Sequence, residues 1–175
     1  LTGNKVFMDN LQQSIEYIMK EFFKDDQFFT RSTSFNENEN FGNLHAPFHD
    51  QSYKTPLATF VGLLRKLSPV FNTATHLDQI KEVYELSKHT ALTNPLANGE
   101  FLRALTYPDD AYRKIEIPLA WLNEDKFTAF LPHFSSRFVM IYHEDENDQK
   151  WQVCNHKECE FTGLGIEEFN KAFGQ

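Results

Sequence analysis

The chain has 175 residues, of which 41% are apolar and 15% are aromatic, so it can bury one substantial core. Its formal net charge of -8 and its scattered basic residues argue against nucleic-acid binding, because phosphates are neutralised by clustered Lys and Arg. Its apolar runs are far shorter than the roughly 18 residues of a membrane span, so we expect a soluble single domain over residues 1–175. The chain begins with Leu1 and has two cysteines, which leaves its compartment open.

The first half of the chain predicts helices. Apolar residues recur at helical spacing from Asp9 onward, with Asp9 as a capping residue. Thr55 and Pro56 are a typical cap and first helical residue of a second helix, which Ser68 and Pro69 end. The predicted helices cover residues 9–24, 56–67, 76–88 and 99–105.

A long polar connection lies between the first two predicted helices. Residues 30–54 are rich in Asn, Ser, Thr and Glu and show no periodicity. Such a connection is uncommon in a compact domain, so we expect a lid or an ordered surface loop. His45 and His49 lie in it, but Pro47 prevents a regular helical pair of imidazoles. We therefore predict ligand contacts there and no metal site.

The last third of the chain favours strands. Residues 112–117 alternate weakly, and residues 121–131 are too short to assign by their periodicity. Residues 138–142 and 151–153 predict two strands of a β-hairpin, and residues 166–173 predict a closing helix. The sequence therefore predicts an α+β fold, in which an N-terminal helical half packs on a small antiparallel β-sheet that a C-terminal helix closes.

The predicted hairpin has an acidic turn. It contains Glu144, Asp145, Glu146 and Asp148, without the spacing of an EF-hand calcium loop. We expect a solvated turn that attracts a basic partner over long range.

Four short segments resemble a known family. Residues 51–58 read Gln-Ser-Tyr-Lys-Thr-Pro-Leu-Ala and precede an apolar helix; residues 137–141 read Arg-Phe-Val-Met-Ile. Residues 151–156 read Trp-Gln-Val-Cys-Asn-His, and residues 167–169 read Glu-Glu-Phe. They are similar, in order, to the nucleophile helix, the His-Phe-Val-Val strand, the strand ending in Asn/Asp-Asp-Pro and the final helix of papain-like peptidases of the C39 type. The resemblance implies a papain-like fold.

The departures from that family concern its catalytic residues. Lys54 stands where the family has its nucleophilic Cys, and Arg137 stands where it has the catalytic His. Gln51 matches the residue that helps to form the oxyanion hole. The resemblance thus implies that peptidase chemistry is absent, and that the family's substrate groove binds a polypeptide instead.

Cys154 and Cys159 flank four residues, a length that suits the loop of a hairpin. A disulfide or a structural thiol pair is favoured over a zinc site. A zinc site would need His143 or His156 to complete its set of ligands. A further alternative is a nucleophilic Cys154 with His156 or His133 as its base.

We therefore predict a non-catalytic module that binds a protein or peptide in a groove between the helical and β halves, without a cofactor. One alternative is a hydrolase that depends on Cys154 or on His45 and His49, and another is an acidic inhibitor or immunity-type protein. The oligomeric state stays open. The candidate ligand-binding residues are Gln51, Lys54, Arg137, Trp121, Trp151, His45 and His49.

Overall fold

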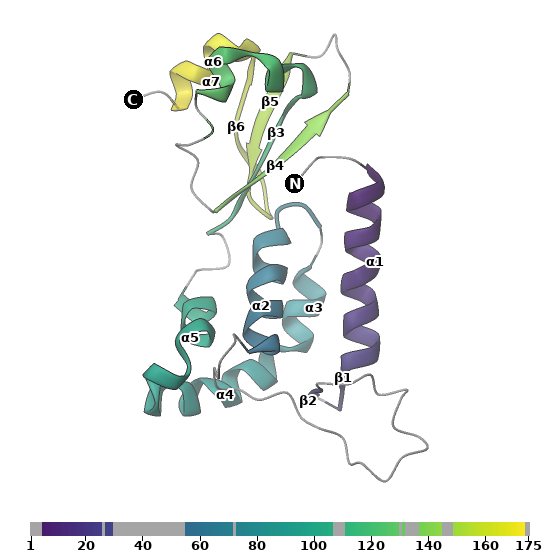
Figure 1. Cartoon of the computed structure of the whole chain (residues 1–175), viewed down its shortest axis with the longest axis vertical. Coiled ribbons are helices and arrows are strands. Elements are labelled where there is room, and N and C mark those ends of the chain that lie inside the picture. The colour runs from purple at the N-terminus through teal and green to yellow at the C-terminus, as the bar shows by residue number, and fades with distance from the viewer. Residues whose placement is uncertain are drawn as a thin grey trace. The chain divides into compact units, whose positions relative to one another are not determined.

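The computed structural model describes residues 5–25, 27–29, 55–71, 73–106, 111–129, 131, 137–144 and 149–173 (Figure 1). The chain divides into two compact units. One consists of Asn10–Arg65 and Thr73–Pro108, and is called here the helical unit. The other consists of Leu1–Asp9, Lys66–Asn72 and Asp109–Gln175, and is called the sheet unit. Residues 30–54, with the predicted lid, lie outside the described residues.

Helices and small sheets are both present, so the predicted α+β class is confirmed. Before residue 110 the elements are α1 (Lys5–Phe22), β1 (Phe23–Lys24), β2 (Gln27–Phe28), α2 (Pro56–Leu67), α3 (Ala74–Gln79), α4 (Lys81–Thr93), η2 (Pro95–Ala97) and α5 (Gly99–Thr106). None of the described helices is both long enough and apolar enough to cross a membrane.

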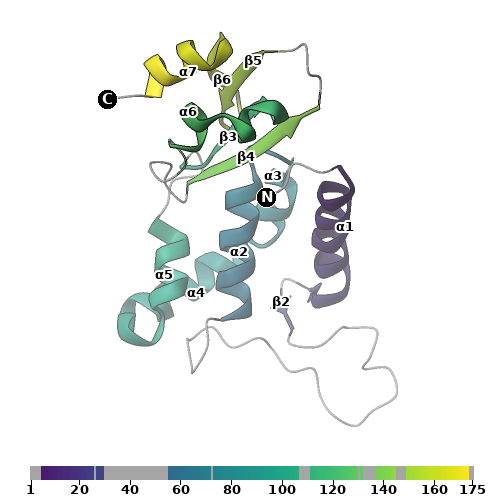
Figure 2. The same cartoon turned by 45° about the horizontal axis from the view of Figure 1, so that its top comes forward.

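The start of α2 follows the prediction from its sequence. The hydroxyl of Thr55 accepts a hydrogen bond of 3.0 Å from the backbone N–H of Ala58, which satisfies a donor that the first helical turn leaves free. In both views α2 lies between α1 and α5 (Figures 1 and 2). The Arg65 guanidinium donates a hydrogen bond to the carbonyl of Ala104 and so ties α2 to α5.

Two predicted helix boundaries are wrong. α1 begins at Lys5, so Asp9 lies inside the helix and does not cap it. The single helix predicted over residues 76–88 is two helices, α3 and α4, that Ile80 separates. Ile80 is buried at this break.

The elements after residue 110 build a four-stranded sheet with helices on one face. They are β3 (Arg113–Pro118), η3 (Leu119–Asn123), α6 (Asp125–Thr128), β4 (Phe138–His143), β5 (Lys150–Cys154), β6 (Cys159–Leu164) and α7 (Gly165–Phe173). The strand order is β4-β3-β5-β6. β3 runs parallel to β4 and antiparallel to β5, and β5 runs antiparallel to β6.

The predicted hairpin of residues 138–142 with residues 151–153 is wrong, because β3 lies between β4 and β5. β3 contributes Ile115 and Ile117, both fully buried, and a central position gives such a strand neighbours on both sides. The sheet is therefore mixed and not purely antiparallel. The predicted hairpin assumed that two strands adjacent in the sequence pair with each other. In the observed order β3 lies between them, in the central position where both isoleucines are buried.

The core of the sheet unit lies on one face of the sheet. Ile115, Ile117, Trp151 and Val153 pack there against Phe169 of α7, together with Trp121 and Phe127. Figure 2 shows α6 and α7 as neighbours beside the strands. Lys126 of α6 donates a hydrogen bond to Glu167 of α7, which ties the two helices together. The predicted closure of the sheet by a C-terminal helix is thus confirmed.

Candidate polypeptide-binding edge

Several predicted site residues lie outside the described residues. They are His45, His49, Gln51, Lys54 and His133. Their predicted roles stay predictions. The structure describes Trp121, Trp151, Arg137, Cys154 and His156, and these belong to the sheet unit.

The two tryptophans are packed inside the core of the sheet unit. Trp121 and Trp151 are each 2% exposed. Phe169 lies between them, with ring centroids 5.6 Å from Trp121 and 5.3 Å from Trp151. The indole N–H of Trp121 donates a hydrogen bond of 3.0 Å to Oε1 of Gln149, whereas that of Trp151 has no partner among the described residues. Both indoles stabilise the sheet unit, and the ligand contacts predicted for them stay a prediction.

Arg137 precedes β4 and has an exposed side chain. Its carbonyl oxygen accepts a hydrogen bond of 3.0 Å from the backbone N–H of Arg113, at the start of the parallel pair of β3 and β4. Its backbone therefore helps to fix the register of the two strands.

Cys154 and Cys159 form a disulfide across β5 and β6, so the predicted pairing is confirmed. A disulfide sulfur is not a nucleophile, because catalysis needs the thiolate. Cys154 thus offers no free thiol for the hydrolase alternative, and His156 is exposed in the loop between the two cysteines. The described ranges contain no group of three or more His, Cys, Asp or Glu residues that could hold a metal ion.

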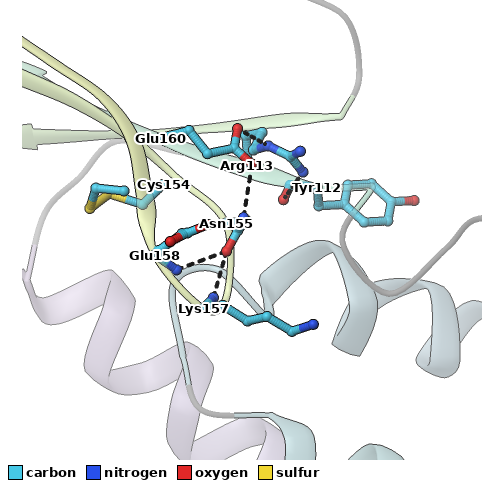
Figure 3. A network of polar contacts seen from close by, with 8 residues as sticks. Tyr112, Arg113, Cys154, Asn155, Lys157, Glu158 and Glu160 are labelled. Atoms are coloured by element: carbon cyan, nitrogen blue, oxygen red, sulfur yellow. Dashed lines mark hydrogen bonds and ion pairs between the residues drawn. A yellow bond between two sulfur atoms is a disulfide. The ribbon is translucent and has the colours of Figure 1, made fainter.

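A polar network supports the loop between β5 and β6 (Figure 3). The side-chain oxygen of Asn155 accepts hydrogen bonds from the backbone N–H groups of Lys157, at 2.6 Å, and Glu158, at 2.9 Å. The amide of Asn155 donates to Glu160 at 2.8 Å, and Nε of Arg113 donates to the same carboxylate at 2.7 Å. The Arg113 hydrogen bond holds the pKa of the Glu160 carboxyl below its usual range, so the charged carboxylate is favoured. The guanidinium of Arg113 balances its negative charge.

The face of the sheet opposite the core carries charged residues in register. Nζ of Lys114 lies 3.1 Å from the Glu116 carboxylate, and the Gln152 amide donates to the same carboxylate at 2.6 Å. Burial raises the pKa of Glu116, but the hydrogen bonds from Gln152 and Lys114 outweigh this effect. The net pKa lies below the ordinary value. These contacts fix β5 against β3.

β6 is an edge strand of the described sheet, and the sequence did not indicate it as a candidate site. β6 pairs with β5 on one side, and the described residues provide no strand on its other side. Gly165 N–H donates to the Gln149 carbonyl at 2.8 Å, which makes these two residues a hydrogen-bonded pair. Because such pairs alternate along an antiparallel ladder, Phe161 and Gly163 bond to β5, and Thr162 and Leu164 direct their backbone groups outward.

The outward groups of β6 differ in their partners. The N–H of Leu164 donates to the Glu168 carboxylate at 2.8 Å, so α7 covers that end of the edge. Thr162 is exposed in the middle of the strand, and its outward N–H and C=O bond to no described residue. Phe161 is 53% exposed and Leu164 is 67% exposed. The centre of β6 thus offers a backbone donor, a backbone acceptor and apolar side chains at the surface.

The signal for this edge in the sequence is weak. Residues 159–164 read Cys-Glu-Phe-Thr-Gly-Leu. From the sequence alone, the apolar residues Phe161 and Leu164 are equally compatible with a buried strand. Only the strand order reveals that they lie at an edge. In comparisons with family models, curated proteins and solved structures, the chain matches none of them.

Proposed function

We propose that the chain is a non-catalytic module that binds a polypeptide in extended form, as a strand added to β6. The exposed centre of β6 at Thr162 carries this proposal. An edge strand presents a row of free N–H and C=O groups, to which another chain pairs as it would within a sheet. The proposal keeps the polypeptide-binding function expected from the sequence and assigns it to described residues.

Side chains on both faces of β6 support such binding. Alternation along the strand directs Phe161 to the core face and Leu164 to the opposite face, and both are largely exposed. Backbone hydrogen bonds to Thr162 would provide affinity for any extended chain. The two apolar side chains would provide a preference for apolar residues beside them.

Two observations favour binding without catalysis. The Cys154 sulfur belongs to a disulfide, and Arg137 stands where the C39-type family has its catalytic His. The resemblance to that family supplies the idea of a polypeptide ligand. The groove expected from it involves Gln51 and Lys54, which lie outside the described residues, so the proposal rests on β6.

The proposal is tested by substituting Thr162 and measuring binding of peptides. Linear peptides are selected from a displayed random library against the wild-type protein, and their affinities are then measured for two variants. Thr162→Pro removes the outward N–H without removing a hydrogen bond to β5. Thr162→Val keeps the N–H and the branched shape of the side chain. We expect binding to Thr162→Pro to be at least about tenfold weaker than binding to Thr162→Val. The proline variant loses the hydrogen bond from residue 162 to the peptide and the close approach of the peptide backbone to β6.

Amide hydrogen exchange in the wild-type protein provides a second measurement that requires no variant. A peptide added to β6 should slow the exchange of the Thr162 amide. It should change the Phe161 and Gly163 amides little, because these already bond to β5. The proposal is wrong if no library peptide is selected. It is equally wrong if the selected peptides leave the Thr162 amide unchanged and bind folded Thr162→Pro as they bind wild type.

A further inference from the structure

We infer that the polypeptide bound along β6 is recognised by its free N-terminus, whose α-ammonium group pairs with the Glu168 carboxylate. This inference rests on the proposed function, since it names the class of segment that the same edge accepts. It commits to the N-terminal end of an extended chain that runs antiparallel to β6, and not to an internal segment. The argument depends on the hydrogen bond between Glu168 and the backbone of Leu164.

Glu168 occupies the outward backbone donor at the end of β6. Its carboxylate accepts the Leu164 N–H at 2.8 Å, in the position that a carbonyl oxygen of an added strand would take. The carboxyl carbon of Glu168 also lies 2.8 Å from the position of a Cβ on Gly163, so it lies directly against the strand. An added strand can pair with Thr162, but its residue opposite Leu164 would bring a second acceptor to an occupied donor. Regular pairing therefore ends before Leu164.

This limit determines which end of the added chain lies at Glu168. A strand antiparallel to β6 has its N-terminal part at the Leu164 end, so its first residue would lie opposite Gly163. In every peptide group a backbone nitrogen lies beside the carbonyl oxygen of the residue before it. The Glu168 oxygen takes the place of that carbonyl oxygen, so the nitrogen of the first residue would lie beside the carboxylate. A free N-terminus places an ammonium group there.

The charges around this end of β6 favour the same chain end. Arg113 pairs with Glu160 on β6 at 2.7 Å, and Lys126 pairs with Glu167 on α7. Glu168 has an exposed side chain, and the described residues provide no cation for it. An ammonium group would bring the compensating charge and additional donors. A strand parallel to β6 would instead bring its C-terminal carboxylate toward Glu168, which the repulsion between like charges disfavours.

Acetylation of the peptide tests the recognition of the ammonium group. Peptides are selected from a random library displayed with free N-termini, and each is synthesised with a free or an acetylated N-terminus. Isothermal titration calorimetry then measures both affinities for the wild-type protein. We expect acetylation to weaken binding at least about fivefold, because it removes the charge and adds a carbonyl group that competes with Glu168 for the Leu164 N–H. Amidation of the C-terminus is the matched control and should change the affinity less than about twofold.

Two neighbouring glutamates provide the protein variants. Glu168→Ala removes the partner of the ammonium group and frees the Leu164 N–H for the acetyl carbonyl group. The preference for the free N-terminus should therefore disappear or reverse. Glu167→Ala removes the same charge from an adjacent exposed side chain, whose partner is Lys126, and should keep the preference.

The pH dependence of binding to wild type provides a measurement that requires no variant. An α-amino group has an ordinary pKa of about 8, so it loses its charge between about pH 6 and about pH 9. Over this range the free peptide should lose its advantage over the acetylated peptide. The acetylated peptide serves as the reference at each pH, because it has no α-amino group to titrate.

The outcomes separate the inference from the proposed function. If the selected peptides slow the exchange of the Thr162 amide but bind equally with free and acetylated N-termini, the inference is wrong and the proposed function stands. A preference that persists in Glu168→Ala, or that Glu167→Ala abolishes to the same extent, likewise overturns the inference. If no library peptide is selected, both the inference and the proposed function are wrong.

Discussion

Trp151 and Gly163 lie opposite each other in the β5–β6 ladder, and the indole occupies the space that a side chain on Gly163 would need. A Cβ at residue 163 would lie 2.6 Å from Cζ2 of Trp151 and 2.8 Å from the carboxyl carbon of Glu168. The glycine therefore allows the indole to lie across β6 while Glu168 reaches the Leu164 N–H. The packing of the core and the protection of one end of the edge depend on the same position.

We predict that Gly163→Ala destabilises the protein. The added methyl group forces the indole or the strand to move, and such overpacking costs about 1 to 3 kcal/mol. Gly62 provides a matched control within α2, because nothing lies within 4 Å of its position for a Cβ. Gly62→Ala should raise the unfolding free energy by about 0.5 to 1 kcal/mol. Urea unfolding monitored by circular dichroism measures both changes, and equal stabilities of the two variants would contradict the prediction.

The two tryptophans differ in one hydrogen bond, which predicts different costs of substitution. Trp121→Phe and Trp151→Phe both remove the same indole volume from the core, but only Trp121 donates to Gln149. We expect Trp121→Phe to lower the unfolding free energy by about 1 kcal/mol more than Trp151→Phe does. Gln149→Ala should reduce this difference, since it removes the acceptor. A larger loss for Trp151→Phe would show that the hydrogen bond is not the deciding contact.

Local and long-range features of the structure differ in how well the sequence could predict them. Local signals worked where the chemistry is local: Thr55 caps α2, and Cys154 pairs with Cys159 across a short hairpin. The order of the strands was missed because the position of β3 between β4 and β5 depends on the burial of Ile115. A period of two or 3.6 residues reports which face is apolar, and does not report which strand is the neighbour.

The sequence did not indicate the proposed binding edge, for a related reason. Trp121 and Trp151 were predicted as apolar anchors of a groove because large aromatic residues are frequent in binding sites. Both are buried in the core of the sheet unit, which such side chains also fill effectively. Thr162 carries no chemical signal of its own in the sequence. The role proposed for it depends on the direction of its backbone groups, which is set by the register of β6 with β5.

The lowered pKa of Glu116 predicts how stability depends on pH. Because the pKa of this carboxyl is lower in the folded protein than the ordinary value of 4.5, its charged form stabilises the fold above that value. This contribution is lost as the pH falls below 4.5 through the lower pKa of the folded state. Glu116→Gln should therefore lose less stability on acidification than wild type. Urea unfolding at about pH 6 and about pH 3 measures this, and Glu144→Gln, with an exposed side chain, is the control.

A steeper acid dependence in Glu116→Gln than in wild type would contradict this assignment. An unchanged dependence in Glu116→Gln would likewise show that Lys114 and Gln152 do not favour the charged carboxylate in the folded protein.

The disulfide and the Asn155 network both stabilise the β5–β6 loop, so we predict that removal of the disulfide lowers stability without opening the loop. Cross-linking Cys154 to Cys159 closes a very short segment, for which the loss of unfolded-chain entropy corresponds to about 2 kcal/mol. Cys154→Ala combined with Cys159→Ala should therefore reduce the unfolding free energy by about this amount. Reduction of the wild-type protein with a phosphine should have a similar effect. The Lys157 and Glu158 amides should stay protected from hydrogen exchange in both cases, because Asn155 still accepts from them.

Asn155→Ala in the oxidised protein is the complementary variant. It keeps the disulfide but removes the acceptor for these two amides and a donor to Glu160, so their exchange should accelerate. Combining it with the double alanine variant should release the loop and weaken the hold of Arg113 on Glu160. If removal of the disulfide alone accelerates exchange at Lys157 and Glu158 as much as Asn155→Ala does, the disulfide and not the Asn155 side chain fixes this loop.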